Sequence, residues 1–292
     1  MLNSIDDVLA SLEHERYVAD RSLGVAIHLA LQLGKPLFLE GEAGVGKTEV
    51  AKVLASILGT RLIRLQCYEG LDVNHAVYEW DYPKQMLAIR LIEAGSERVE
   101  VDDIMSRDYL ISRPLLQAVE ASTGGERPVL LIDELDRADE EFEAYLLELL
   151  SDFQVTIPEI GTIAAQQPPV VVLTSNRTRE IHDALKRRCI YHWIDYPDFD
   201  REVAIVLRKV PGVSQALAAD LAGAMEKLRR MDLFKPPGVA ETLDWAAALT
   251  VLGTERLDPE AAEDTLGVIL KYQEDIERLR AGGTAQLLAS AS

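Results

Sequence analysis

The sequence contains little cysteine, no long apolar run and fewer basic than acidic residues. Two cysteines in 292 residues, Cys67 and Cys189, cannot build a disulfide framework, which is typical of a reducing compartment. No apolar stretch reaches the roughly 20 residues that span a bilayer. The opening segment, MLNSIDDVLASLEHE, lacks the basic and apolar regions of a secretory signal. These absences predict a cytoplasmic protein.

The charge balance also excludes some partners. The chain has 30 basic and 49 acidic residues, which gives a formal net charge of −19. A strongly anionic protein gains nothing by coating another polyanion, so general DNA or RNA binding is disfavoured, although a local basic groove is compatible with this charge. An apolar fraction of 48% is ordinary for a folded protein and disfavours disorder over the whole chain.

Two regions differ in their hydrophobic pattern. Up to residue 197, short apolar runs alternate with helical patterns, which predicts an α/β domain with a parallel five-stranded sheet flanked by helices. From residue 198 to 292 the pattern is helical only, so we expect a second, α-helical domain. The expected strands are 36–40, 61–65, 127–132, 169–174 and 190–194, and the expected helices of the second domain are 199–209, 213–231, 239–252 and 258–281.

The segment Gly41-Glu-Ala-Gly-Val-Gly-Lys-Thr48 matches the phosphate-binding pattern G-x-x-x-x-G-K-[ST] at every fixed position. Glycines let backbone N–H groups turn inward around an anion, and the N-terminus of the following helix adds positive potential. A chance lysine in a glycine-rich turn is the alternative, but the strand before and the helix after favour the phosphate site. We expect nucleotide contacts from Gly41, Ala43, Gly44, Val45, Gly46, Lys47, Thr48 and Glu49.

Within that loop, Lys47 can reach the β and γ phosphates of a nucleotide, and the Thr48 hydroxyl can bind Mg²⁺. A second buried run, VLLI, ends in Asp133 and Glu134. Beside a phosphate loop these two carboxylates have separate expected roles, because Asp133 would bind Mg²⁺ and Glu134 would polarise the attacking water. Without the loop, they could equally be the acidic end of an ordinary strand.

Two further positions are candidates for the site. Asn176 follows the run VVVLTS, where it could orient the lytic water or contact the γ-phosphate, or alternatively cap the next helix. Arg187 and Arg188 precede the last expected strand, where one of them could neutralise charge on the ATP of a neighbouring subunit. The alternative for these arginines is a solvated basic turn.

Taken together, GEAGVGKT, LLIDELDRAD, VVLTSN and ALKRRC resemble the motifs of AAA+ ATPases, and within them the MoxR group. The resemblance covers nearly the whole chain and implies an ATP- and Mg²⁺-dependent ATPase with a helical lid. It assigns Lys47 and Thr48 to the Walker A motif, Asp133 and Glu134 to Walker B, and Asn176 to sensor 1. Arg188 fits the arginine finger best and Arg187 second.

MoxR-type proteins carry an insertion before the Walker B strand and a hairpin before the sensor 1 strand. The resemblance places them here at about 71–110 and about 154–168. Related lids open with a sensor 2 arginine, whereas the corresponding stretch here, 237–242, contains none. Tyr78, Trp80 and Tyr82 form an aromatic cluster in the insertion that would contact a client protein or pack against its own domain.

The stretch CYEGLDVNHAVYEWDYPKQMLAIR looks most like the CoxD branch of the MoxR group. That resemblance implies a homo-oligomeric, hexameric ring and a partner with a von Willebrand factor A domain. The client it implies is a molybdenum hydroxylase such as carbon monoxide dehydrogenase, which the ATPase would remodel or help to mature. Two alternatives are a DNA-processing AAA+ ATPase and a nucleotide-gated scaffold without turnover.

Overall fold

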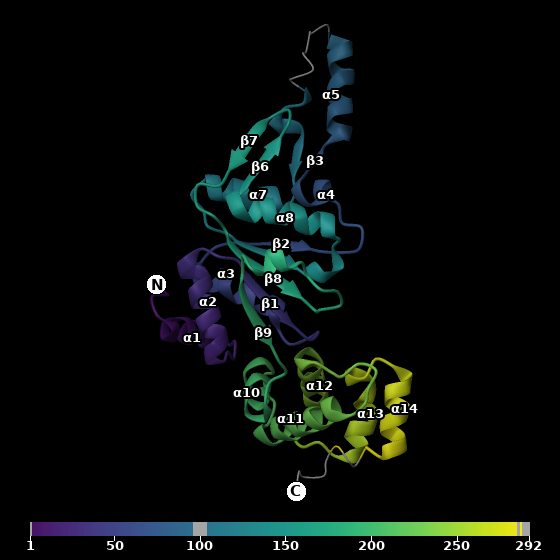
Figure 1. Cartoon of the computed structure of the whole chain (residues 1–292). Coiled ribbons are helices and arrows are strands. Elements are labelled where there is room, and N and C mark those ends of the chain that lie inside the picture. The colour runs from purple at the N-terminus through teal and green to yellow at the C-terminus, as the bar shows by residue number, and fades with distance from the viewer. Residues whose placement is uncertain (1, 96–103, 285–286, 288–292) are drawn as a thin grey trace. The chain divides into compact units, whose positions relative to one another are not determined.

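The structure is a computed structural model that describes residues 2–95, 104–284 and 287. The chain divides into two compact units (Figure 1). The first contains the residues up to Val8, Arg21–Glu40 and Thr48–His192, and the second contains Leu9–Asp20, Gly41–Lys47 and the residues from Trp193 onward. Parts of two expected regions, residues 96–103 of the insertion and 285–286 and 288–292 of the lid domain, lie outside the described residues.

A five-stranded sheet with the order β2-β5-β8-β1-β9 forms the centre of the α/β region. The three pairs β2–β5, β5–β8 and β1–β8 are parallel. The expected parallel sheet flanked by helices is therefore confirmed. The strands are β1 (Leu37–Gly41), β2 (Leu62–Gln66), β5 (Val129–Asp133), β8 (Val170–Ser175) and β9 (Ile190–Ile194).

The central strands are covered on both faces. Every residue of β5 and β8 is buried, which explains why both segments are continuous apolar runs instead of alternating ones. On one face, Leu130 and Ile132 belong to the same hydrophobic core as Leu116 and Phe142 of two flanking helices. The helices of this region are α1 (Ile5–His14), α2 (Arg21–Leu33), α3 (Lys47–Leu58), α4 (Val73–Val77), α5 (Tyr82–Gly95), α7 (Pro114–Thr123), α8 (Glu140–Asp152) and α9 (Asp183–Lys186), with 3-10 turns η1 (Arg107–Tyr109) and η2 (Leu135–Arg137).

The insertion contains both a pair of antiparallel strands and helices. Strands β3 (Tyr78–Trp80) and β4 (Leu110–Ser112) pair antiparallel, and α5 begins two residues after β3. A second antiparallel pair, β6 (Gln154–Ile157) and β7 (Gly161–Ala164), forms the hairpin that the sequence predicts in this segment. In Figure 1 both lie at the same end of the first unit, and α7 contacts β4, β6 and β7.

The second unit is built mainly from α10 to α14. Its core contains the fully buried Trp245, whose indole N–H donates to the Thr265 hydroxyl at 2.6 Å. One expectation is wrong: the single helix expected over 258–281 is two helices, because Leu270 adopts an extended backbone and is buried next to Ile269. The helices are α10 (Phe199–Lys209), α11 (Gln215–Arg230), α12 (Val239–Val251), α13 (Pro259–Ile269) and α14 (Gln273–Gly282).

Candidate functional site

The glycine-rich loop follows β1 and leads directly into α3, whose first residue is Lys47. The Lys47 ammonium group donates to the carbonyl oxygens of Gly41 at 2.8 Å and Glu42 at 2.6 Å. The side chain is thus folded back over its own loop and is buried. This arrangement holds a positive charge inside the loop, where an anionic ligand would be bound.

Gly44, in the middle of the loop, is in close contact with the start of α12 in the same unit. Its φ of +77° is a conformation that favours glycine, and its carbonyl oxygen accepts the Ala240 N–H at 3.2 Å. A Cβ on the opposing Gly238 would lie 2.7 Å from the Ala43 carbonyl oxygen. A side chain at Gly44 would therefore be strained by its φ, and a side chain at Gly238 would require the backbone of the loop or of the helix to move.

The remaining loop positions differ in their surroundings. Val45 is buried, with 8% of its surface exposed, and Gly46 has a φ of +94°. Glu49 lies in the first turn of α3 and pairs with Lys52 at 3.3 Å. Its carboxylate is therefore engaged on the helix surface in this structure.

Asp133, the last residue of β5, carries a carboxylate that is almost fully buried, at 2% exposure. Oδ1 accepts hydrogen bonds from the hydroxyls of Thr48 at 2.9 Å and Thr174 at 2.6 Å. Oδ2 is paired with the guanidinium group of Arg64, at 2.5 Å from Nη2 and 3.0 Å from Nε. The structure therefore brings together Thr48 and Asp133, the two residues expected to bind Mg²⁺, although 85 positions separate them in the sequence.

Glu134 adopts a left-handed backbone conformation, with φ 55° and ψ 50°, directly after the strand. Its backbone N–H donates to the Thr174 hydroxyl at 2.9 Å, and its carboxylate lies 4.0 Å from the guanidinium group of Arg137. The Thr174 hydroxyl thus contacts both acidic residues, donating to the Asp133 carboxylate and accepting from Glu134. The Glu134 side chain itself is 40% exposed, so water can reach it.

Asp136 connects the turn after β5 to the segment after β8 through hydrogen bonds. Its carboxylate accepts the backbone N–H groups of Asn176 at 3.1 Å and Thr178 at 2.9 Å, and the Thr178 hydroxyl at 2.6 Å. Burial acts to raise the pKa of Asp136, but these hydrogen bonds outweigh it and lower the pKa below its ordinary value of 3.8. Asn176 does not cap the next helix, because His182 holds that position. The capping alternative is therefore wrong.

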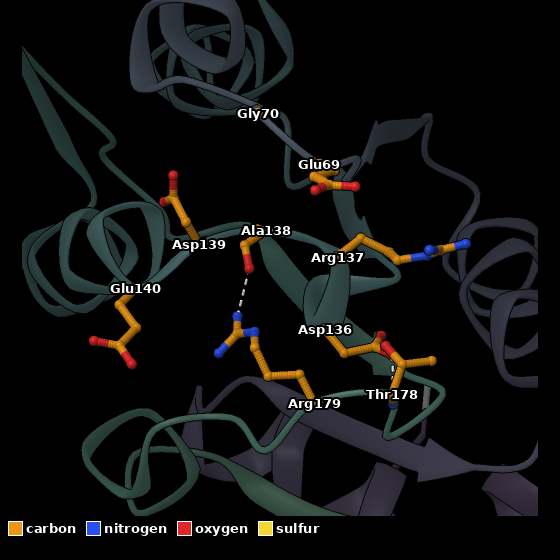
Figure 2. Close-up of a pocket in the computed structure, with 9 residues that line it drawn as sticks. All are labelled: Glu69, Gly70, Asp136, Arg137, Ala138, Asp139, Glu140, Thr178 and Arg179. Atoms are coloured by element: carbon orange, nitrogen blue, oxygen red, sulfur yellow. Dashed lines mark hydrogen bonds between the residues drawn. The ribbon is translucent and has the colours of Figure 1, made fainter.

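A cavity of about 420 Å³ lies beside the same turn (Figure 2). Across it, Arg179 donates to the Ala138 carbonyl oxygen at 2.6 Å and pairs with the buried carboxylate of Glu143 at 2.5 Å. Its walls carry charges of both signs and include none of the expected catalytic residues. The lining residues are Glu69, Gly70, Asp136, Arg137, Ala138, Asp139, Glu140, Thr178 and Arg179.

Arg187 and Arg188 follow α9 and precede β9, an edge strand of the sheet. Both side chains are exposed. Arg188 donates from Nη1 to the carbonyl oxygen of Leu147, in α8, at 2.5 Å. Arg187 caps α9 through its backbone, and no ion pair of its side chain occurs among the residues that the structure describes. The two arginines thus differ in how firmly they are held.

The start of α12 carries no arginine, but Arg229 of α11 lies against it. Its Nε donates to the carbonyl oxygen of Pro237 at 3.0 Å. The guanidinium group forms two bonds with the carboxylate of Glu202, at 2.6 and 2.7 Å, and stacks over the Tyr196 ring with 4.5 Å to the centroid. Both charged side chains are at most 8% exposed. Arg229 therefore anchors the start of α12 through Pro237 and pairs with the buried Glu202 carboxylate.

The structure separates the three aromatic residues of the insertion. Tyr78 and Trp80 pack against the core, with ring centroids 6.2 Å apart in an edge-to-face arrangement. Tyr82, at the start of α5, is 64% exposed. Packing is therefore the correct interpretation for Tyr78 and Trp80.

Sequence reasoning missed Arg64, Thr174, Asp136 and Arg229. An arginine in the middle of the strand run RLIRL is the one signal that was available, since a charge there needs a partner. The other three are common residue types whose roles depend on contacts between distant segments. For Asp136 and Thr178 the separation is 42 positions, and for Arg229 and Glu202 it is 27.

The cysteines take no part in this site. Cys67 is buried, and burial together with the nearby charge of Asp133 raises the pKa of its thiol to about 12. Burial likewise raises the pKa of Cys189 to about 12.

No group of three or more histidine, cysteine, aspartate and glutamate side chains suited to a metal ion occurs in the described part of the chain. Among the helices of the described residues, none has the length and apolar character needed to cross a membrane.

Comparison with known proteins gives a family match. The model of the AAA domain, dynein-related subfamily, matches residues 36–189. An uncharacterized protein of Staphylococcus epidermidis is 25% identical over 207 residues, which cover 68% of this chain and 70% of that protein. An uncharacterized protein of Staphylococcus aureus is 26% identical over 175 residues, 58% of each chain.

Among solved structures, a mutant of RuvB from Thermotoga maritima aligns with a TM-score of 0.50 at 20% identity. The alignment covers 94% of this chain and 74% of that chain. At this identity the likeness concerns the fold alone. It agrees with the predicted P-loop AAA+ fold, a parallel sheet flanked by helices and followed by a helical region.

Proposed function

The chain belongs to the AAA family, in its dynein-related subfamily, and on that basis we propose that it is a Mg²⁺-dependent ATPase. The observation that carries the proposal is the contact of the Thr48 hydroxyl with the buried Asp133 carboxylate at 2.9 Å. A hydroxyl and a carboxylate are the protein ligands that Mg²⁺ takes when nucleotide phosphates supply others. The donor set therefore fits a nucleotide-bound Mg²⁺ ion, and Thr48 directly follows the lysine of the phosphate loop.

The chain's own residues divide the chemistry among them. Backbone N–H groups of residues 41–48 and the Lys47 ammonium bind the phosphates, and for this Lys47 exchanges its two carbonyl partners for phosphate oxygens. Glu134 accepts a proton from the attacking water, and Asn176 orients that water. Mg²⁺, when bound, neutralises charge that develops on the transferred phosphate. Thr174 is a positioning residue, because its hydroxyl contacts both Asp133 and Glu134.

Separate measurements of binding and turnover test these roles. Glu134→Gln should bind ATP as the wild type does and lose about 10²- to 10⁴-fold in turnover, since a positioned general base contributes about that much. Lys47→Ala should instead weaken binding itself, because it removes a charge from the phosphate loop. Isothermal titration with ATP and a phosphate-release assay measure the two quantities. Near wild-type turnover in Glu134→Gln, or unchanged affinity in Lys47→Ala, contradicts the assignment.

Each of these two variants has a control that removes a charge of the same sign from another exposed position. Lys84→Ala removes an exposed lysine from α5, and Glu140→Gln neutralises an exposed glutamate six residues after Glu134. Both variants should keep wild-type affinity and turnover. If either control behaves like its partner variant, the effects reflect net charge and not position.

We further propose that the active site is shared between subunits of a homo-oligomeric ring, which we infer to be hexameric. The position of Arg187 and Arg188 before an edge strand supports this proposal, because an edge of the sheet can face a neighbouring subunit. Arg188 is our first assignment for the arginine finger and Arg187 the second. Engaging a neighbour's ATP would require Arg188 to release the Leu147 carbonyl, which costs little at an exposed position.

Mixing variants tests the shared site. An arginine finger supplied in trans is worth about 10³- to 10⁵-fold in rate, so Arg188→Ala should bind ATP and be nearly inactive. Mixing Arg188→Ala with Lys47→Ala should restore some activity, because one interface then pairs an intact loop with an intact finger. Arg187→Ala in the same assay distinguishes the two arginines. Wild-type activity per subunit that stays constant down to monomeric samples, with no recovery on mixing, contradicts the shared site.

For the cellular role, we propose MoxR-type remodelling in the CoxD branch, directed at a molybdenum hydroxylase-type client with a von Willebrand factor A-domain partner. The motif resemblance and the presence of both an insertion and the hairpin β6–β7 support it. Within the insertion, the exposed side chains of α5 are the candidate client contacts: Tyr82, Met86, Leu87 and Leu91 are 55–65% exposed. Leu87→Ser should keep ATPase activity and melting temperature and reduce client maturation, whereas unchanged maturation argues against this contact.

The two alternative functions make different predictions. A DNA-processing ATPase should be stimulated by DNA. The net charge of −19 disfavours DNA binding and therefore this alternative. RuvB is described as a Holliday junction branch migration motor, but its likeness to this chain at 21% identity concerns the fold alone. A scaffold without turnover should bind ATP and release no phosphate. An ATPase rate that DNA leaves unchanged supports the proposal over both alternatives.

A further inference from the structure

Arg64 is the one cationic side chain that pairs with Asp133 among the residues that the structure describes, and no motif assigns it a role. It lies on β2, whose register with β5 places Gln66 opposite Asp133 and Arg64 opposite Leu131. From there the guanidinium group reaches Oδ2 of Asp133 with two nitrogens, at 2.5 and 3.0 Å, and also donates to the Gln66 side-chain oxygen. The arginine therefore lies at the same carboxylate that is expected to bind the metal ion.

The Asp133 carboxylate is buried, at 2% exposure, and a buried carboxylate charge is costly unless it is paired and hydrogen-bonded. The hydroxyls of Thr48 and Thr174 donate to Oδ1, with Thr48 also 3.3 Å from Oδ2, and Oδ2 receives the charged hydrogen bonds of Arg64. In the structure described here, Arg64 thus supplies the countercharge that a metal ion would supply in the nucleotide-bound protein.

From this geometry we propose that Arg64 is a built-in counter-ion of Asp133 that has to leave the carboxylate when Mg²⁺ and nucleotide bind. The inference rests on the proposed function and adds that Arg64 influences how nucleotide binding depends on Mg²⁺. A second cation bound at the same carboxylate repels the guanidinium group, so Mg²⁺ and Arg64 compete for Asp133. Arg64 can move away without a change in the strand, because its side chain is 49% exposed and Gln66 offers a second acceptor. The strength of the Arg64–Asp133 pair therefore sets the Mg²⁺ concentration at which nucleotide binds tightly.

The test measures nucleotide binding as a function of free Mg²⁺, with no turnover involved. The affinity of a fluorescent ADP analogue is determined at a series of Mg²⁺ concentrations, and the midpoint of its increase is compared between variants. A charge-assisted hydrogen bond is worth about tenfold or more in a binding constant, so Arg64→Gln should lower the Mg²⁺ midpoint about tenfold. Arg61→Gln is the matched control, because Arg61 precedes the same strand and pairs with the exposed Glu126 at 3.2 Å. Its midpoint should equal that of the wild type.

Melting without nucleotide gives a second readout. Arg64→Gln should lower the melting temperature in the absence of Mg²⁺, since Asp133 loses its cation, and Asp133→Asn in the same chain should restore part of the loss. If Arg64→Gln does not fold, Arg64→Lys serves instead. It keeps the charge but loses the two-pronged contact, and its Mg²⁺ midpoint should fall about threefold.

The outcomes separate this inference from the proposed function. A midpoint in Arg64→Gln that is unchanged or higher than in the wild type overturns the inference and means that Arg64 stays in place to orient Asp133. A higher midpoint in Arg64→Lys does the same. If the wild type binds no nucleotide at any Mg²⁺ concentration, the proposed function fails as well, and the two failures are distinguishable by the wild-type titration alone.

Discussion

Replacing Gly238 by alanine tests the contact between the phosphate loop and the start of α12. Gly238 is the N-cap of α12, with φ −87° and ψ −173°, a backbone conformation that alanine adopts without strain. The only obstacle is therefore the added methyl group. It would lie 2.7 Å from the Ala43 carbonyl oxygen and 3.0 Å from Gly44 Cα, both backbone atoms that cannot rotate away.

The size of the effect follows from this clash. Inserting one carbon into a well-packed contact typically costs about 1–3 kcal/mol, because the surroundings must shift. If the loop gives way, the loss appears in nucleotide affinity, where it corresponds to about 5- to 150-fold. We expect Gly238→Ala to weaken ATP binding by about tenfold or more, with a smaller decrease in melting temperature.

Titration calorimetry with ATP and thermal melting provide the assay. Gly267→Ala is the control, since Gly267 lies in α13 and a Cβ there meets nothing within 4 Å. Alanine stabilises a helix interior by about 0.5–1 kcal/mol relative to glycine, so this variant should melt at the same or a higher temperature and bind ATP normally. Wild-type affinity in Gly238→Ala would refute the reasoning, because it would mean that the loop binds nucleotide without this contact.

Three further predictions concern contacts inside the two units. Thr174→Val keeps the shape of the side chain but removes the hydroxyl between Asp133 and Glu134, so turnover should fall at least tenfold while ATP affinity changes little, as phosphate release and titration would show. Asp136→Asn should destabilise the protein in urea unfolding at pH 7 by about 1.5–3 kcal/mol. Folding lowers the pKa of Asp136, so its carboxylate stabilises the folded protein fully above the unfolded pKa near 3.8. This stabilisation is lost as the pH falls through the folded pKa. A difference in unfolding free energy between Asp136→Asn and wild type that stays constant down to the lowest measurable pH contradicts this. Arg229→Ala leaves the buried Glu202 carboxylate without its cation and should cost about 3–5 kcal/mol in urea unfolding, with no loss indicating an unimportant pair.

The sheet could be predicted because its central strands β5 and β8 are short continuous apolar runs, a pattern that favours strands buried on both faces of a parallel sheet. The ends of the helices were harder to predict. The helix expected over 258–281 breaks at Leu270, since burying both Ile269 and Leu270 outweighs the helical pattern on either side. Such a break depends on what the neighbouring helices offer for packing, and the local sequence does not contain that information.

In the site, the residues with a fixed spacing were found and those defined by contact were not. The phosphate loop and the Asp133-Glu134 pair follow patterns that chemistry imposes on the sequence. By contrast, Thr174 and Asp136 act through hydrogen bonds to residues some 40 positions away. Any polar side chain at a strand end could make such bonds, so the sequence alone does not distinguish them from ordinary surface residues.

Phosphate release from ATP by the purified wild-type chain tests the central claim most directly. We predict release that requires Mg²⁺, stops on addition of EDTA and increases per subunit with protein concentration. Under the same conditions Glu134→Gln should bind ATP and release almost no phosphate. ATP binding by the wild type with no phosphate release at any protein concentration would contradict the account, because the Thr48, Asp133 and Glu134 cluster would then hold a nucleotide without hydrolysing it.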